Sequence, residues 1–200
     1  MKNNIKFNEI EAMLPVYVKD KGNCTEIITK EASFIKIATI ETCTKKLADY
    51  YNISLYHNRI NYGQELGITN KVPLVVNENL IYIYINVREP MFAHDAAYGL
   101  FDVNSIENVY DDEGKAVIEM KSGKMVKTRQ SVKSLKKGML NARIAKDIYK
   151  EKHNKWDAKN NKNTKWQGDG GSVIKCPART VPYGCPLWVS PMVSGYFYYF

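Results

Sequence analysis

Runs of alternating apolar and polar positions occupy much of the chain before residue 127. The clearest run covers residues 80–87, where Ile81, Ile83 and Ile85 fall on one face of an extended chain and tyrosines on the other. This period of two is typical of a β-strand, and the tyrosine face either covers a second layer or meets a partner. Shorter runs predict strands at residues 14–18, 26–29, 34–39, 72–76, 98–103, 106–110 and 116–121, with a hairpin turning at residues 122–123.

Two segments change to the period of a helix. One begins at Thr42 or Thr44, both helix-capping residue types, and runs to about residue 52, and the other covers residues 131–152. Residues 57–71 are polar and are expected to form a loop. The pattern therefore predicts an α+β fold: a mostly antiparallel sheet of short strands with one helix near 42–52 and a basic amphipathic helix near 131–152.

Charge is distributed unevenly along the chain. The 200 residues carry a formal net charge of +8, but residues 1–114 hold 11 Lys and Arg against 16 Asp and Glu, while residues 115–200 hold 18 against 5. A positive charge confined to one segment favours a polyanion as partner, nucleic acid first and an anionic membrane second.

Composition divides the chain into three parts. Residues 1–153 have the mixture of apolar and charged residues of a globular domain and are expected to form one α+β DNA-binding domain. Residues 154–167 are rich in Lys and Asn and are expected to be a flexible linker. Residues 168–200 contain 5 of the 12 glycines and 4 of the 7 prolines. This tail is either a loop-rich extension that docks through its aromatic residues or a foreign segment from a gene junction.

The chain lacks the residue patterns of an enzyme or a metal site. His94 and Asp95 form an isolated pair, and the glycines near residue 170 lack the Gly-Lys-Ser/Thr of a phosphate-binding loop. The four cysteines form no CxxC pair, so we expect them to be reduced and unligated. We therefore expect no catalysis, no metal and no cofactor. Without a membrane-spanning apolar run or a signal peptide, a cytoplasmic location with no membrane partner is expected.

The basic segment is the strongest functional signal. Residues 115–165 contain 16 Lys and Arg against 4 acidic residues, and the chain contains only five arginines. Abundant Lys and Asn with few Arg suit contacts with the DNA backbone and with A·T pairs in the minor groove. On charge, we predict DNA contacts at Arg59, Lys71, Lys121, Lys124, Lys127, Arg129, Lys133, Lys136 and Lys137.

Several short motifs occur in an order that resembles the competence transcription factor family (ComK). They are residues 55–59 (LYHNR), residues 67–76 (GITNKVPLVV), the strand at 80–87, residues 98–101 (YGLF) and the hairpin at 120–124 (MKSGK). Arg59 matches the arginine of the family's Tyr-x-x-Arg, Lys71 and Pro73 match its Lys-x-Pro, and Lys124 matches its hairpin Gly-Lys. The likeness spans roughly residues 5–153.

The resemblance implies a cytoplasmic activator of DNA-uptake genes that recognises paired A/T boxes through the minor groove and bends the DNA. It also implies self-association as a dimer or tetramer, contact with RNA polymerase and control by an adaptor-protease system. The family's short aromatic C-terminal segment, which is used in adaptor recognition, has no equivalent after Lys152. We therefore expect a truncated or interrupted copy in which adaptor control and activation are altered or lost while DNA binding persists.

One other class of function remains. The helix at residues 131–152 also fits a basic interaction module that binds an anionic membrane or an acidic protein without reading DNA. Such a module would bind anionic vesicles as tightly as duplex DNA, and this comparison separates the two hypotheses.

Overall fold

The computed structural model describes residues 6–93 and 95–162, and it confirms the α+β class with antiparallel sheets. Its strands are β1 (Ile10–Val18), β2 (Gly22–Thr29), β3 (Ser33–Lys36), β4 (Leu74–Asn77), β5 (Leu80–Asn86), β6 (Tyr98–Asp102), β7 (Ile106–Asp112), β8 (Lys115–Met120) and β9 (Met125–Lys127). The helices are α1 (Ile40–Tyr50), α2 (Leu55–Leu66) and α3 (Val132–Lys162), with short 3-10 turns at Phe7–Glu9 and Val103–Ser105.

The strands form two sheets. The larger has six strands in the order β3-β2-β1-β6-β5-β4, and the smaller has three in the order β7-β8-β9. Every assigned strand pair is antiparallel. The predicted hairpin is the β8–β9 connection, where Gly123 has φ 80°, a left-handed conformation that glycine adopts without strain.

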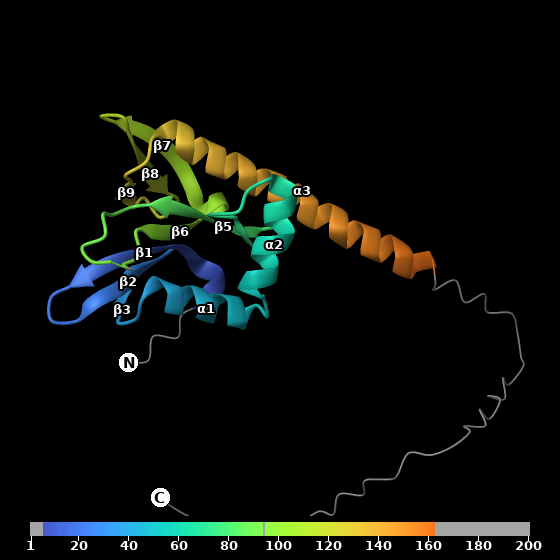
Figure 1. Ribbon diagram of the computed structural model, residues 1–200, viewed down its shortest axis with the longest axis horizontal. Coiled ribbons are helices and arrows are strands. Elements are labelled where there is room, and N and C mark those ends of the chain that lie inside the picture. The colour runs from blue at the N-terminus through green and yellow to red at the C-terminus, as the bar shows by residue number, and fades with distance from the viewer. Residues whose placement is uncertain (1–5, 94, 163–200) are drawn as a thin grey trace, which may run out of the picture. The chain divides into compact units, whose positions relative to one another are not determined.

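The larger sheet is covered on both faces, because β5 alternates as the sequence predicts. Ile81, Ile83 and Ile85 pack into a core with the small sheet and with Leu135 of α3. Tyr82, on the opposite face, is fully buried in a second core with Leu47 of α1. Figure 1 shows α1 and α3 on opposite sides of this sheet. The tyrosine face was expected either to cover a second layer or to meet a partner, and Tyr82 covers a second layer.

α1 begins slightly earlier than predicted. Its N-cap is Thr39, whose hydroxyl accepts a hydrogen bond from the Thr42 backbone N–H, rather than Thr42 or Thr44. The Thr44 hydroxyl instead donates to the Ile40 carbonyl inside the helix. The predicted helix is thus correct in place and type and shifted by about one turn at its start.

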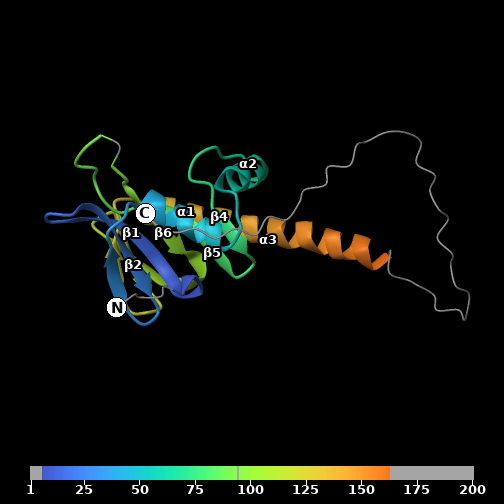
Figure 2. The same ribbon diagram turned by 90° about the horizontal axis from the view of Figure 1, so that it is seen from below.

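The loop expected at residues 57–71 is wrong over most of its length, because residues 55–66 form α2. Ser54 caps its start, and Gly67, with φ 64°, ends it in the left-handed conformation. The buried positions of α2 are Asn58 and Gly63, not apolar residues. Figure 2 shows α2 beside β4, and the Asn58 side chain joins them: its Nδ2 donates to the Pro73 carbonyl at 3.1 Å and its Oδ1 accepts from the Val75 N–H at 3.2 Å.

α3 is the predicted basic helix, and it extends to Lys162 instead of about residue 152. Ser131 caps its start, accepting from the Ser134 N–H at 3.3 Å. The first nine residues of the predicted linker, 154–162, are therefore helical. The rest of that linker and the tail at 168–200 lie outside the described residues, so the predicted division of the chain stays a prediction. No helix in the described part is long and apolar enough to cross a membrane.

Candidate nucleic-acid interface

The exposed side of α3 carries a group of basic residues that form no ion pair with a described carboxylate. Leu135, Ala142 and Ala145 turn inward and are almost fully buried. With about 100° per residue, the opposite side presents Lys133, Lys136, Lys137 and Arg143, all of them exposed. None of these four has a carboxylate within 4.0 Å among the described side chains. We call these four residues the α3 basic face.

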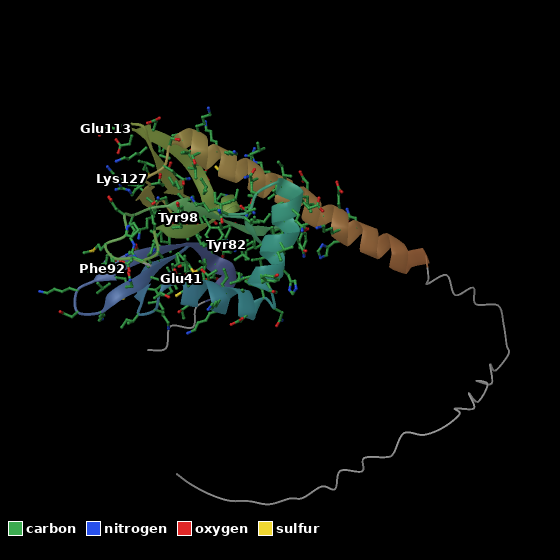
Figure 3. The ribbon with its side chains drawn as sticks, viewed as in Figure 1. Glu41, Tyr82, Phe92, Tyr98, Glu113 and Lys127 are labelled. Carbon is green, nitrogen blue, oxygen red and sulfur yellow. The ribbon has the colours of Figure 1, made fainter. Side chains whose placement is uncertain are left out.

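Two of the predicted DNA contacts in the small sheet, Lys124 and Lys127, form ion pairs within the fold, unlike the cations of the α3 basic face. Lys124 pairs with Glu26 and also donates to the Ser33 hydroxyl at 3.1 Å, so it connects the two sheets. Lys127 lies 3.0 Å from Asp112. Figure 3 shows Lys127 close to the β7–β8 turn, which contains Glu113. An ion-paired cation retains less net charge for a phosphate than an unpaired one.

The remaining small-sheet cations differ from each other. Arg129, just after β9, pairs with Glu89 at 3.0 Å. Lys121, just after β8, is exposed and has no carboxylate within 4.0 Å among the described side chains. Of the four predicted contacts at residues 121–129, three are therefore ion-paired within the fold.

Arg59 and Lys71 lie together at a pocket between α1, α2 and the six-stranded sheet. The Lys71 ammonium donates to the Tyr98 hydroxyl at 2.6 Å and lies 4.0 Å from the centre of that ring. The Lys71 backbone has φ 55°, so the segment that places it is itself in an uncommon conformation. Lys71 also lines a second depression together with Lys137 of α3, which joins the pocket to the α3 basic face.

Two features of this surface differ from the sequence prediction. Arg143, on the basic side of the predicted helix, belongs to the α3 basic face although it is not among the predicted DNA contacts, and helical spacing from Lys136 identifies it. Leu140 and Ile144, two apolar residues of the predicted amphipathic helix, do not pack and are 54% and 42% exposed between the cations. The flank that packs is the one with Leu135 and Ala142, because only that side of α3 meets the sheets.

Metal-binding groups are not apparent in the described part of the chain, which contains no cluster of three or more His, Cys, Asp or Glu able to hold an ion. Cys24 and Cys43 are buried free thiols. Cys176, Cys185 and His94 lie outside the described residues.

Comparison with known proteins identifies no family. No protein-family model matches the sequence, and no curated protein matches it. Among solved structures, the LytTr DNA-binding domain of a Bacillus cereus protein described as a methyl-accepting/DNA response regulator is similar over 68% of this chain and 84% of that chain. The identity is 14% and the TM-score 0.33, which is too low to support a function. The resemblance to the competence transcription factor family stays a prediction.

Proposed function

We propose that this protein binds double-stranded DNA through the α3 basic face. The observation that carries the proposal is that Lys133, Lys136, Lys137 and Arg143 are exposed on one side of a helix with no carboxylate within 4.0 Å among the described side chains. Like charges fixed this closely repel each other, and phosphates relieve that repulsion. The helix is held by buried Leu135, Ala142 and Ala145, so the cations are presented on a rigid element.

Phosphate contacts of this kind release counterions. The logarithm of the binding constant then falls with the logarithm of salt concentration by about 0.9 per contact for duplex DNA. Lys121, Lys71 and Arg59 are unpaired with carboxylates among the described side chains and extend the candidate contact set beyond α3. The paired residues Lys124, Lys127 and Arg129 are secondary candidates.

The more specific part of the proposal rests on the sequence. We propose more specifically that the protein is a transcription regulator that recognises A/T-rich boxes through the minor groove and controls genes for DNA uptake. The support is the order of motifs from residue 55 to residue 124 and the excess of Lys and Asn over Arg. Self-association, contact with RNA polymerase and an adaptor-protease system follow from the same resemblance, as does a binding role without catalysis.

The test is a fluorescence-anisotropy titration of the full chain on a duplex across salt concentrations. Replacing Lys133, Lys136 and Lys137 together by Gln is expected to lower the salt slope by up to about 2.7, at about 0.9 per lost contact. The matched control replaces Lys19, Lys36 and Lys46, three exposed lysines outside α3, and removes the same charge. An equal decrease of the salt slope in the two triple variants would mean that α3 is not the contact surface.

A second function is favoured by one observation, the exposure of Leu140 and Ile144 between the cations of α3. A basic helix face that contains apolar side chains also fits the surface of an anionic bilayer. Vesicles containing phosphatidylserine separate the alternatives. If the full chain bound these vesicles as tightly as duplex DNA at the same salt, the membrane function would replace the DNA function.

A further inference from the structure

The pocket at Arg59 and Lys71 has the size and lining of a small-molecule site. Its volume is about 710 Å³, and its walls come from α1, α2, the segment at 69–72, β4, β5, β6 and the connection that precedes β6. Ligand sites in proteins are clefts of roughly 300–1,000 Å³ with mostly apolar walls and a few convergent polar groups. Ile40, Leu55, Val72, Leu74 and Leu100 supply such walls here.

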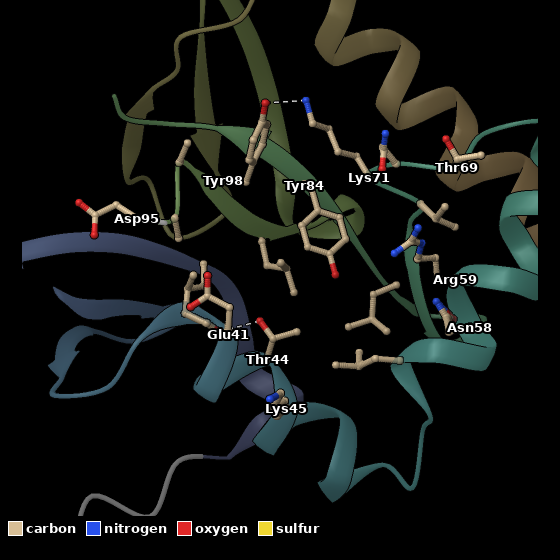
Figure 4. A pocket seen from close by; sticks show the side chains of 18 of the residues that line it. Glu41, Thr44, Lys45, Asn58, Arg59, Thr69, Lys71, Tyr84, Asp95 and Tyr98 are labelled. Carbon is tan, nitrogen blue, oxygen red and sulfur yellow. Dashed lines mark hydrogen bonds between the residues drawn. The ribbon is translucent and has the colours of Figure 1, made fainter. Parts of the chain in front are cut away.

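The polar groups that line this pocket include the Tyr84 hydroxyl and the Arg59 guanidinium. Figure 4 shows the Tyr84 side chain among the lining residues, with its hydroxyl directed into the space between α1 and α2. That hydroxyl has no hydrogen-bond partner among the described residues and is free to donate to a ligand; burial raises the pKa of Tyr84 above its ordinary value, so the hydroxyl stays protonated well above neutral pH. The Arg59 guanidinium lies on the α2 side and has no carboxylate within 4.0 Å among the described side chains.

The other charged residues that line the pocket determine whether the positive charge of Arg59 is offset by a nearby carboxylate. Lys71 also lines the pocket, but its ammonium is directed away from Arg59 to the Tyr98 hydroxyl (Figure 4). Asp95 is engaged, because its two oxygens accept from the Asn23 amide at 2.6 Å and the Phe92 N–H at 2.9 Å. Glu41 lies across the pocket on α1 and near Lys45, away from Arg59 (Figure 4). The Arg59 end is therefore positive and the centre is apolar.

We propose that this pocket binds a small anionic amphiphile, a carboxylate with an apolar body. The carboxylate accepts from Arg59 and from the Tyr84 hydroxyl, and the apolar body lies against Leu74 and Leu100. Burial of the body removes apolar surface from water, while the charged head meets a bidentate donor. Because Arg59 and Lys71 are also predicted DNA contacts, such a ligand would compete with DNA at this edge of the interface. The ligand site itself does not depend on DNA binding.

The test uses decanoate as the probe and decanol as its neutral analogue, with the full chain in a calorimetric titration. Decanoate is expected to bind saturably with one site per chain, about tenfold or more tighter than decanol. Arg59→Gln is expected to weaken decanoate by about tenfold and leave decanol unchanged. Tyr84→Phe, which removes only the hydroxyl, is expected to weaken decanoate several-fold. Lys19→Gln, at an exposed position outside both the pocket and the α3 basic face, is the matched control and leaves both affinities unchanged.

Three results would overturn the proposal: no saturable binding of decanoate, equal affinity for decanoate and decanol, or unchanged decanoate affinity in Arg59→Gln. Arg59 is exposed, so its replacement is not expected to unfold the chain, and a melting curve of the variant checks this. DNA titrations of the same preparations keep the outcomes separate. If the wild-type chain binds decanoate but no duplex, only the proposed function is contradicted; if it binds duplex but not decanoate, only the pocket proposal is contradicted.

Discussion

The Nζ of Lys127 lies 3.0 Å from Oδ2 of Asp112, so a cation that looks free in the sequence is ion-paired in the fold. Lys136, on α3, has no such partner among the described side chains. We expect Lys136→Gln to lower the salt slope of DNA binding by about 0.9 and Lys127→Gln to lower it by less. Anisotropy titrations at four or more salt concentrations measure both. A larger effect at Lys127 would place the interface on the small sheet instead of α3.

The two apolar rows of α3 are expected to differ in their effect on stability. Leu135 is fully buried, so Leu135→Ala is expected to lower the free energy of unfolding by about 2–5 kcal/mol. Leu140 is 54% exposed, and Leu140→Ala is expected to change it by no more than about 0.5 kcal/mol. Urea denaturation of both variants measures the difference. Similar losses in the two variants would show that Leu140 packs against the domain.

The Asn58 side chain is expected to hold α2 against β4. Asn58→Ala removes the partner of both the Pro73 carbonyl and the Val75 N–H, which are buried at this point, so a loss of about 1–3 kcal/mol in the free energy of unfolding is expected. Asn61→Ala, at an exposed position of the same helix, is the control. Equal stability of the two variants would argue against this link.

Asp102 gives stability a defined pH dependence. Burial raises the pKa of this carboxyl, partly offset by hydrogen bonds from the Ser105 hydroxyl at 2.7 Å and the Asn104 N–H at 3.3 Å. The folded chain therefore holds the proton more tightly than the unfolded chain. The Asp102 contribution to stability falls as the pH rises from the unfolded pKa, about 3.9, through the raised folded pKa.

The check is the difference in unfolding free energy between the wild type and Asp102→Asn, measured by urea denaturation at several pH values. This difference is expected to become less favourable to the wild type as pH rises through that window. Asn61→Ala, at an exposed position of α2, is the control, because it changes no titratable group. A difference that grows in favour of the wild type with rising pH would contradict the assignment.

Much of the sheet is predictable from the sequence because its strands bury alternate residues. The two faces of β5 supply two separate cores, which is one of the two arrangements that strict alternation of Ile and Tyr at residues 81–85 allows. α2 is not predictable in the same way. Its buried positions are Asn58 and Gly63, so it lacks the apolar stripe that identifies an amphipathic helix.

The candidate site is less predictable than the fold. The pairing of Lys124 with Glu26 joins residues 98 positions apart, and no local pattern encodes it. The exposure of Leu140 follows from which side of α3 meets the sheets, and helical spacing alone allows either apolar row to pack. Arg59 and Lys71 line the same pocket because α2 forms one of its walls. Since the sequence analysis predicts a loop in place of α2, it does not predict the pocket.

Sequence-selective binding to A/T-rich DNA is the central claim, and competition between duplexes at one fixed salt concentration tests it most directly. The full chain is titrated on an A/T-box duplex, a G/C duplex of equal length, and a duplex in which inosine·cytosine replaces A·T. Inosine·cytosine keeps the minor-groove acceptors of A·T and changes the major groove, so a minor-groove reader treats the two alike. The account predicts tight binding to the A/T and inosine duplexes and weaker binding to the G/C duplex. Equal affinity for the A/T and G/C duplexes would contradict it.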